Sequence, residues 1–165
     1  MVAGIPRNNV STDKNEWCTP LNLYEKLDAE FHFTLDAAAT QKNALAPIYI
    51  SKESNALEQD WHEESGAGAI FLNPPYGRGV IEEFVKKAFW ESRGGATVVC
   101  LLPLSGAKWF KTYCLLADEI RIIGRVKYIG FASDGTLIRN SPTFDSCVVI
   151  FRPGIHAAKL TEFEW

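Results

Sequence analysis

Short apolar runs alternate along this chain with segments of helical periodicity. Six short runs rich in β-branched or aromatic residues predict strands, at residues 31–36, 48–50, 69–72, 97–102, 120–123 and 147–151. Apolar residues recur every three or four positions after Pro20, from Val80 to Phe89 and from Ala107 to Ala117, and these segments predict helices. We expect Thr19 and Pro20 to be the N-cap and the first residue of the first helix.

This alternation predicts an α/β fold, with a mostly parallel sheet and helices on both of its faces. The runs at 120–123 and 147–151 have no obvious helix between them, so we expect them to pair antiparallel at an edge of the sheet. The stretch between them is polar and turn-rich, with a turn expected at Asp134–Gly135. Ligands of open α/β sheets bind at the carboxyl ends of strands. Asp36, Asn73 and Pro103 all follow such strands and therefore mark the expected site.

A chain of 165 residues is long enough for one domain with a hydrophobic core. We expect residues 1–15 to form a flexible arm and residues 16–165 a single domain. The first residues lack the apolar segment of a signal peptide, and no run approaches the ~20 apolar residues of a membrane helix. The four cysteines form no CxxC pair and no cluster with histidine, so we expect a cytoplasmic protein without bound metal.

Charge is distributed unevenly along the chain. The net charge of −3 argues weakly against nucleic acid as a partner. Residues 1–80 carry 6 Lys and Arg against 11 Asp and Glu, whereas residues 81–165 carry 11 against 9. A local basic face can bind phosphate on a protein that is acidic overall. Taken alone, however, this charge pattern favours ordinary solvated surface side chains.

The most informative motif is Asn-Pro-Pro-Tyr at residues 73–76, between an apolar run and Gly77. The two prolines fix the backbone, so the Asn73 side-chain carbonyl and the Pro74 backbone carbonyl can be preorganised as hydrogen-bond acceptors. Together they can accept both protons of an amine on an aromatic ring, which localises the nitrogen lone pair for attack on an electrophile. Tyr76 can stack on the same ring. We prefer this interpretation to a simple Pro-Pro turn because an apolar strand precedes the motif.

Three further segments are candidates for a cofactor pocket, and each has a structural alternative. Asp36 and the small residues after it either meet a cationic cofactor or cap the next turn. Asp60 and Trp61 either contact an adenine ring or are a surface acid beside a core tryptophan. Residues 16–20 either line the pocket or only begin a helix. The glycine-rich fingerprint of ATPases and NAD enzymes is absent, which argues against both of those classes.

In combination these segments resemble the small phage and prophage DNA N6-adenine methyltransferases that use S-adenosylmethionine. NPPY alone is shared by several amine methyltransferases, whereas its combination with the EWCTP and LDAAAT segments is more specific. The resemblance spans most of the chain. It rests on residues 16–20, 23–24, 31–40, 55–57, 60–61, 71–76, 141–142 and 145–151.

The resemblance implies a Rossmann-like class I methyltransferase fold with a reversed last strand, and S-adenosylmethionine as the cofactor. It implies that the target base is received by the catalytic residues Asn73, Pro74, Pro75 and Tyr76. The implied cofactor-binding residues are Trp17, Thr19, Pro20, Asp36, Ala37, Ala38, Asn55, Asp60, Trp61 and Asn73. Alanines stand at residues 37–39, where many methyltransferases have a glycine-rich loop.

The resemblance further implies that the substrate is double-stranded DNA and that the location is the host cytoplasm if a phage encodes the chain. We expect a monomer or a weak dimer. Specificity would rest on loops around 104–111 and 124–146, since we expect no separate recognition domain. Candidates for phosphate contacts are Arg78, Lys108, Arg125, Lys127 and Arg139.

Two alternatives remain open from the sequence. Enzymes with the NPPY motif also methylate guanine amines in RNA and glutamine amides in proteins, so the acceptor is not fixed by the motif. The second alternative is not an enzyme: a module that binds the cofactor or a nucleic acid without turnover.

Overall fold

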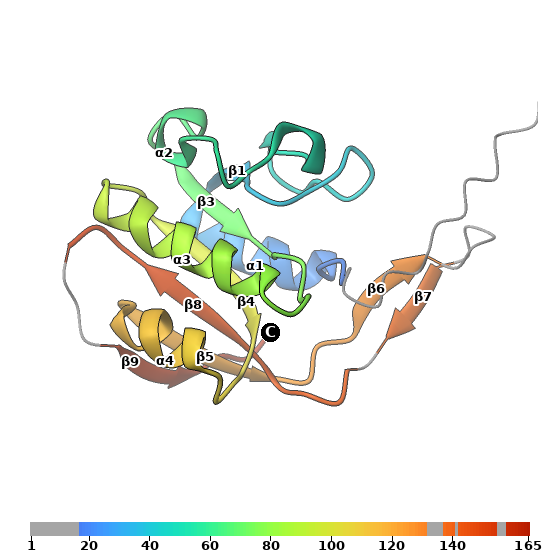
Figure 1. Cartoon of the computed structure of the whole chain (residues 1–165). Coiled ribbons are helices and arrows are strands. Elements are labelled where there is room, and N and C mark those ends of the chain that lie inside the picture. The colour runs from blue at the N-terminus through green and yellow to red at the C-terminus, as the bar shows by residue number, and fades with distance from the viewer. Residues whose placement is uncertain (1–16, 132–136, 141, 155–157) are drawn as a thin grey trace, which may run out of the picture.

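The computed structural model describes residues 17–131, 137–140, 142–154 and 158–165. Its centre is a seven-stranded sheet with the strand order β2-β1-β3-β4-β8-β5-β9 (Figure 1). The strands are β1 (Phe33–Asp36), β2 (Ile48–Tyr49), β3 (Ala69–Leu72), β4 (Val98–Pro103), β5 (Glu119–Gly124), β8 (Ser146–Phe151) and β9 (Lys159–Glu162). All six predicted strands are present, and β9 is an additional one. The expected arm at 1–15 and the turn at Asp134–Gly135 lie outside the described residues.

Pairing within the sheet is mostly parallel, as predicted. β1 pairs parallel with β2 and β3, β3 with β4, and β5 with β9. β8 runs antiparallel to both β4 and β5, which confirms the predicted antiparallel pair. However, β8 lies inside the sheet and not at its edge, and the last strand in the sequence is the parallel strand β9. The reversed strand is therefore β8, the last but one in the sequence, and not the last strand as expected. The α/β architecture agrees with a Rossmann-like methyltransferase fold.

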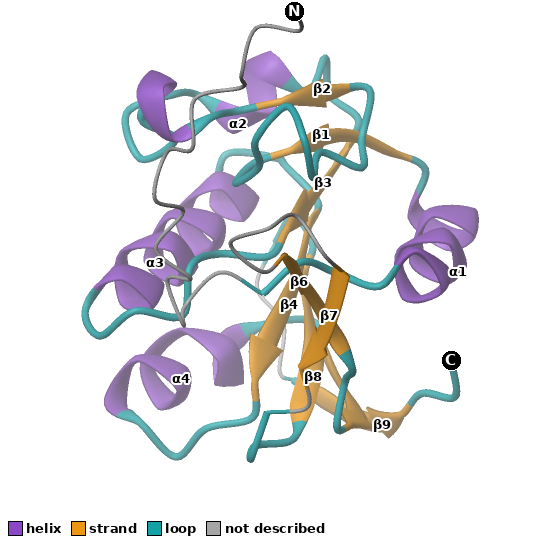
Figure 2. Cartoon of the chain, turned by 90° about the vertical axis from the view of Figure 1, so that its right-hand side faces the viewer, coloured by secondary structure: helices purple, strands orange, loops and turns teal. Residues whose placement is uncertain are grey.

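The central strands are apolar on both faces because helices cover both faces (Figure 2). In β4, Val98, Cys100 and Leu102 belong to the core beneath α3 (Val80–Arg93) and α4 (Lys108–Tyr113). The alternate residues Val99 and Leu101 belong to the core beneath α1 (Leu21–Phe31). A strand buried on both sides needs no polar alternate positions, which explains the continuous apolar run at 97–102.

The first helix differs from the prediction at both ends. Its N-cap is Pro20, without a side-chain capping hydrogen bond, and the Thr19 hydroxyl instead accepts a hydrogen bond from the Asn73 side chain. The helix also includes Phe31, which the alternating pattern had placed in a strand. His32 follows with a left-handed backbone (φ 55°) and turns the chain into β1. Phe31 fits both patterns in the sequence, and the structure assigns it to the helix.

The other helices are short, apart from α3. The helix predicted from the apolar residues between Val80 and Phe89 is confirmed as α3, and it ends at Arg93 as expected. The predicted helix at 107–117 is divided into α4 and a 3₁₀ turn, η2 (Cys114–Leu116). Two helical elements were not predicted, the 3₁₀ turn η1 (Lys52–Ser54) and α2 (Trp61–Glu64). Among the described residues no helix has the length and hydrophobicity needed to span a bilayer.

The turn-rich stretch between β5 and β8 contains a hairpin that forms a separate two-stranded sheet, to the right of the main sheet in Figure 1. Its strands are β6 (Tyr128–Phe131) and β7 (Leu137–Asn140), which pair antiparallel. Cys18 adds an antiparallel bridge to Ile129 of β6, with hydrogen bonds of 3.0 and 2.9 Å between their backbones. The hairpin is therefore joined to the segment just before α1.

Candidate active site

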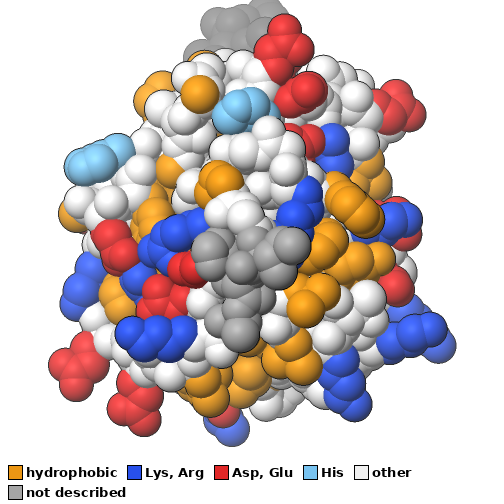
Figure 3. Space-filling model, turned by 90° about the vertical axis from the view of Figure 1, so that its left-hand side faces the viewer, with side chains coloured by type: hydrophobic (Ala, Val, Ile, Leu, Met, Phe, Trp, Pro, Cys, Tyr) orange, Lys and Arg blue, Asp and Glu red, His pale blue; other side chains and the backbone are white. Residues whose placement is uncertain are grey.

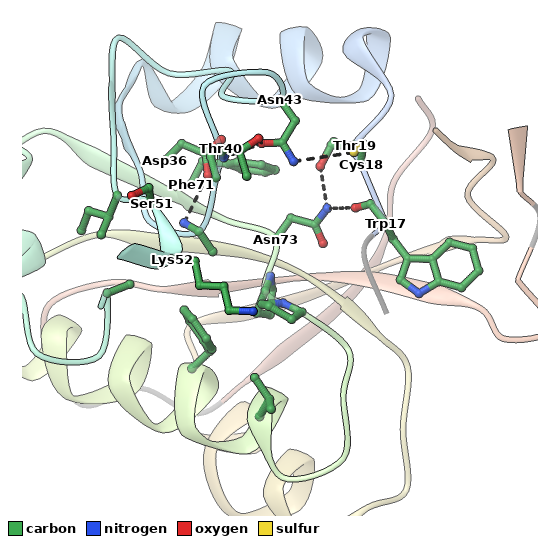
Figure 4. Close-up of a pocket in the computed structure, with 18 of the residues that line it drawn as sticks. Trp17, Cys18, Thr19, Asp36, Thr40, Asn43, Ser51, Lys52, Phe71 and Asn73 are labelled. Carbon is green, nitrogen blue, oxygen red and sulfur yellow. Dashed lines mark hydrogen bonds between the residues drawn. The ribbon is translucent and has the colours of Figure 1, made fainter. Parts of the chain in front are cut away.

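Asn73 directly follows β3, at the carboxyl end of a parallel strand. Its side-chain nitrogen donates a hydrogen bond to the backbone oxygen of Trp17 and another, 2.9 Å long, to Oγ1 of Thr19. Figure 4 shows these contacts beside the labelled cavity residues. A backbone carbonyl can only accept a hydrogen bond, so the Trp17 oxygen fixes which end of the amide faces it.

The other end of this amide has no partner. The Oδ1 atom of Asn73 is buried, and none of the described residues donates a hydrogen bond to it. Leaving a buried acceptor unpaired costs about 1–3 kcal/mol in a folded protein. Such a group is expected where a ligand supplies the missing donor, and an amine N–H is a suitable one.

Asp36 lies at the end of β1 and is almost completely buried, with 3% of its surface exposed. Its carboxylate accepts hydrogen bonds from the backbone N–H of Leu45 at 3.2 Å and of Ala38 at 3.4 Å. Burial raises its pKa to about 6, although the two N–H donors act in the opposite direction. Asp36 therefore caps its loop, as one of the two alternatives predicted, and it also lines the cavity described next.

Asn73 and Asp36 line one cavity of about 340 Å³, within the range of small-molecule sites. The wall comes from the segment before α1, the loops after β1 and β2, the NPPY corner and the start of α3. The lining residues are Trp17, Cys18, Thr19, Asp36, Ala38, Ala39, Thr40, Asn43, Leu45, Ile50, Ser51, Lys52, Asn55, Ala56, Leu57, Phe71, Asn73, Pro74, Pro75, Gly77, Val80 and Phe84. The sheet edge expected from the sequence therefore carries a cavity at Asp36 and Asn73, whereas Pro103, the third residue expected there, does not line it.

Six of the predicted cofactor-binding residues meet at this cavity: Trp17, Thr19, Asp36, Ala38, Asn55 and Asn73. Pro20 and Ala37 do not line it: Pro20 begins α1 as its N-cap, and Ala37 is fully buried. The prediction that Trp61 covers a cofactor ring is wrong. Its side chain has no exposed surface, and its indole N–H donates to the Ala56 carbonyl at 2.7 Å.

Asp60 is likewise absent from the cavity wall. It is exposed, and its carboxylate accepts a hydrogen bond from the backbone N–H of Glu63 at 2.9 Å, as the N-cap of α2. Asp60 and Trp61 thus follow the structural alternative, a surface acid beside a core tryptophan. Neither residue is part of the site proposed below.

Pro74 and Pro75 line the cavity, but Tyr76 stands beside it. The Tyr76 ring is half-buried and packs edge-on against Tyr128 and Phe144, with centroids 6.0 and 5.9 Å away. Burial holds the pKa of its phenol well above the usual value, so Tyr76 keeps its proton and cannot act as a base. Stacking of Tyr76 on a target base stays a prediction.

Several cavity residues were missed by the sequence analysis. Thr40 and Asn43 come from the loop after β1, and Ser51 and Lys52 follow β2 (Figure 4). Polar residues directly after strands are the signal that could have identified them. Phe84 comes from the apolar stripe of α3, where the sequence pattern cannot distinguish a cavity wall from a core position.

The candidate phosphate contacts are on the surface. Arg78, Lys108, Arg125 and Lys127 are exposed, and Arg139 lies on β7, where its side chain is outside the described residues. Two other late arginines, Arg121 and Arg152, form ion pairs with Glu30, Asp118 and Glu119 instead. Figure 3 views the molecule from the side where β3 begins, and acidic and basic side chains are interspersed on this face. The described residues contain no group of three or more metal-ligating side chains.

Comparison with known proteins gives two matches. A family model described as DNA N-6-adenine-methyltransferase (Dam) matches residues 7–161, which include every residue of the cavity wall. A DNA N-6-adenine-methyltransferase of Escherichia phage T1 is 31% identical to this chain over 115 residues. The match covers 68% of the chain and 46% of the phage protein, so the chain spans about half the length of this relative. Because the family model matches nearly the whole length of the chain, the chain belongs to the DNA N-6-adenine-methyltransferase (Dam) family.

Proposed function

We propose that this chain transfers a methyl group from S-adenosylmethionine to the N6 amine of adenine in double-stranded DNA. The observation that carries the proposal is the buried, unpartnered Oδ1 atom of Asn73, at the wall of a cavity beside two prolines. The family to which the chain belongs and the printed name of the phage T1 relative support the same reaction.

The residues of the cavity fit this cofactor chemically. When bound, S-adenosylmethionine supplies an electrophilic methyl group on a positively charged sulfur, and its amino group is also cationic. Asp36 offers a buried carboxylate that takes part in none of the ion pairs of the described residues. A cation beside Asp36 would favour its charged form and lower its pKa again. Ile50, Leu57 and Phe84 provide apolar wall for a flat ring.

The role of the NPPY corner follows from the nature of the amine. The lone pair of the adenine N6 is conjugated into the ring, so this nitrogen is a weak nucleophile. Asn73 Oδ1 and the Pro74 carbonyl accept the two N–H protons and draw the lone pair onto nitrogen. No strong base is needed, because the amine can lose its proton after transfer. Catalysis then comes from positioning and from stabilising the positive charge that develops on nitrogen.

The target adenine cannot reach this corner while it is stacked inside a duplex, so it must be flipped out. Exposed Arg125 and Lys127 immediately precede the β6–β7 hairpin, and Arg78 follows the NPPY corner. These positions flank the corner and suit phosphate contacts that hold the DNA while the base is extruded. Tyr76, the partly exposed aromatic residue of the motif, offers a stacking surface for the flipped base.

The test measures transfer of a tritiated methyl group to unmethylated DNA, to RNA and to a protein extract in parallel. We expect incorporation into DNA as N6-methyladenine, whereas incorporation only into RNA or protein would support another acceptor. Asn73→Ala should abolish transfer and leave binding of S-adenosylmethionine largely intact. Asn22→Ala is the matched control, because Asn22 is exposed on α1 and outside the cavity wall. Near-normal methylation by Asn73→Ala would contradict the role of Asn73.

A further inference from the structure

A chain of hydroxyl groups connects the NPPY corner to the sheet and to the hairpin. The Tyr76 hydroxyl donates to the backbone oxygen of Leu101 at 3.0 Å and lies 3.0 Å from the Tyr128 hydroxyl. The Tyr128 hydroxyl lies 2.9 Å from Oγ of Ser146. Tyr128 and Ser146 have no exposed surface. The chain thus starts at the proposed catalytic motif and ends on β8.

The direction of this chain follows from counting protons. Each hydroxyl carries one proton. The Tyr76 proton is used on the Leu101 carbonyl, so the Tyr76 oxygen accepts from Tyr128, and the Tyr128 oxygen then accepts from Ser146. Burial raises the pKa of Tyr128 to about 12, so both phenols stay protonated near neutral pH. The chain is therefore a fixed structural link with one consistent orientation.

Tyr128 also connects the hairpin to the residues that hold Asn73. It is the first residue of β6, and its neighbour Ile129 exchanges two backbone hydrogen bonds with Cys18. The Trp17 ring packs against the Tyr128 ring, with centroids 5.5 Å apart. Trp17 and Thr19, on either side of Cys18, are the two acceptors for the Asn73 amide. The start of β6 thus supports Tyr76 directly and Asn73 through residues 17–19.

We propose that Tyr128 is a positioning residue for methyl transfer, and that it couples the β6–β7 hairpin to the NPPY corner. The inference rests on the proposed function. Tyr128 acts through its hydroxyl on Tyr76, and through the Cys18–Ile129 bridge the same strand supports the segment that orients Asn73. Its contribution is therefore to the transfer step and not to the affinity for cofactor or DNA.

The test is Tyr128→Phe, which removes the hydroxyl and keeps the ring that packs against Trp17 and Tyr76. With DNA and S-adenosylmethionine both saturating, we expect the single-turnover rate constant to fall roughly three- to tenfold, the range for loss of one hydrogen bond. The dissociation constants for cofactor and for DNA should stay within about twofold of the unmodified protein. Tyr113→Phe is the matched control, a half-buried tyrosine on α4 outside this chain of hydroxyls, and should retain the full rate.

A double variant tests whether the two hydroxyls act as a unit. If they do, Tyr76→Phe combined with Tyr128→Phe should be no slower than Tyr76→Phe alone. A Tyr128→Phe rate within twofold of the unmodified protein would overturn the inference, and so would a loss of DNA affinity with an unchanged saturating rate. If the unmodified protein itself transfers no methyl group, the proposed function fails, which is a distinct result from failure of this inference.

Discussion

The amide nitrogen of Asn73 lies 2.9 Å from the hydroxyl oxygen of Thr19, which is 54 residues earlier in the chain. Thr19 is 8% exposed, so this hydrogen bond is largely shielded from water. With the Trp17 carbonyl, Thr19 determines that Asn73 turns its oxygen, and not its nitrogen, toward the unpaired position. The side chain proposed to accept the amine proton is thus oriented by a segment outside the sheet.

Thr19→Val should slow methyl transfer by roughly three- to tenfold, because one of the two contacts that orient the Asn73 amide is lost. Valine keeps the shape of threonine, so the expected change in the thermal midpoint is small. Single-turnover kinetics with saturating cofactor measures the effect. Thr19→Ser, which keeps the hydroxyl, should retain most of the rate. Equal rates for Thr19→Val and Thr19→Ser would show that the Trp17 carbonyl alone orients Asn73.

Asp36 should make the fold less stable as the pH rises from about 4 to about 6. Burial raises its pKa from 3.8 to about 6 in the folded protein, which therefore binds this proton more tightly than the unfolded chain does. The resulting stability is present below about pH 4 and is lost as the pH rises through 6, with a size of about 3 kcal/mol. Urea unfolding across this range measures the free energy of unfolding at each pH.

Asp36→Asn isolates this contribution, since its side-chain oxygen can still accept from Leu45 and Ala38 but does not titrate. Relative to the unmodified protein, the variant should gain stability progressively between about pH 4 and pH 6. Glu25→Gln, at an exposed position on α1, serves as the control and should not change the pH profile. Parallel pH profiles for Asp36→Asn and the unmodified protein would rule out a buried, titrating Asp36.

Replacing Arg125 and Lys127 by glutamine should weaken DNA binding and reduce its dependence on salt. Each lost phosphate contact lowers the slope of log affinity against log salt by about 1, and the effect should be similar on all DNA sequences. Binding of labelled duplex DNA at several salt concentrations gives the slope. Lys159→Gln, at an exposed position on β9, is the control for removing a surface charge elsewhere, and the comparison is made per charge removed. If the double variant keeps the salt slope of the unmodified protein, these two residues are not phosphate contacts.

The sequence predicted most of the sheet because its strands are buried on both faces and are therefore read as continuous apolar runs. It also located Asp36 and Asn73, since each directly follows such a strand and the carboxyl ends of parallel strands meet at one edge. The hydrogen bond between Thr19 and Asn73 could not be predicted, because a threonine before a proline is equally suited to cap a helix. Only the folded chain brings these two residues together.

The residues and strands that the sequence analysis misplaced or missed each have a specific cause. The family resemblance implied that Trp61 contacts the cofactor, yet α2 turns its ring fully into the core. Lys52 was missed although the strand before it was predicted, because a single lysine after a strand also fits an ordinary surface position. β9 was missed because its residues are mostly exposed, so it shows no apolar run.

The bridge between Cys18 and Ile129 has a practical consequence for testing whether the β6–β7 hairpin determines which DNA is methylated. Exchanging this hairpin for that of a relative would replace the bridge partner of residues 17–19, which line the cavity and include the two acceptors of the Asn73 amide. Grafting should therefore transfer both segments as one module. A graft of the hairpin alone would be expected to bind its new target and methylate it slowly.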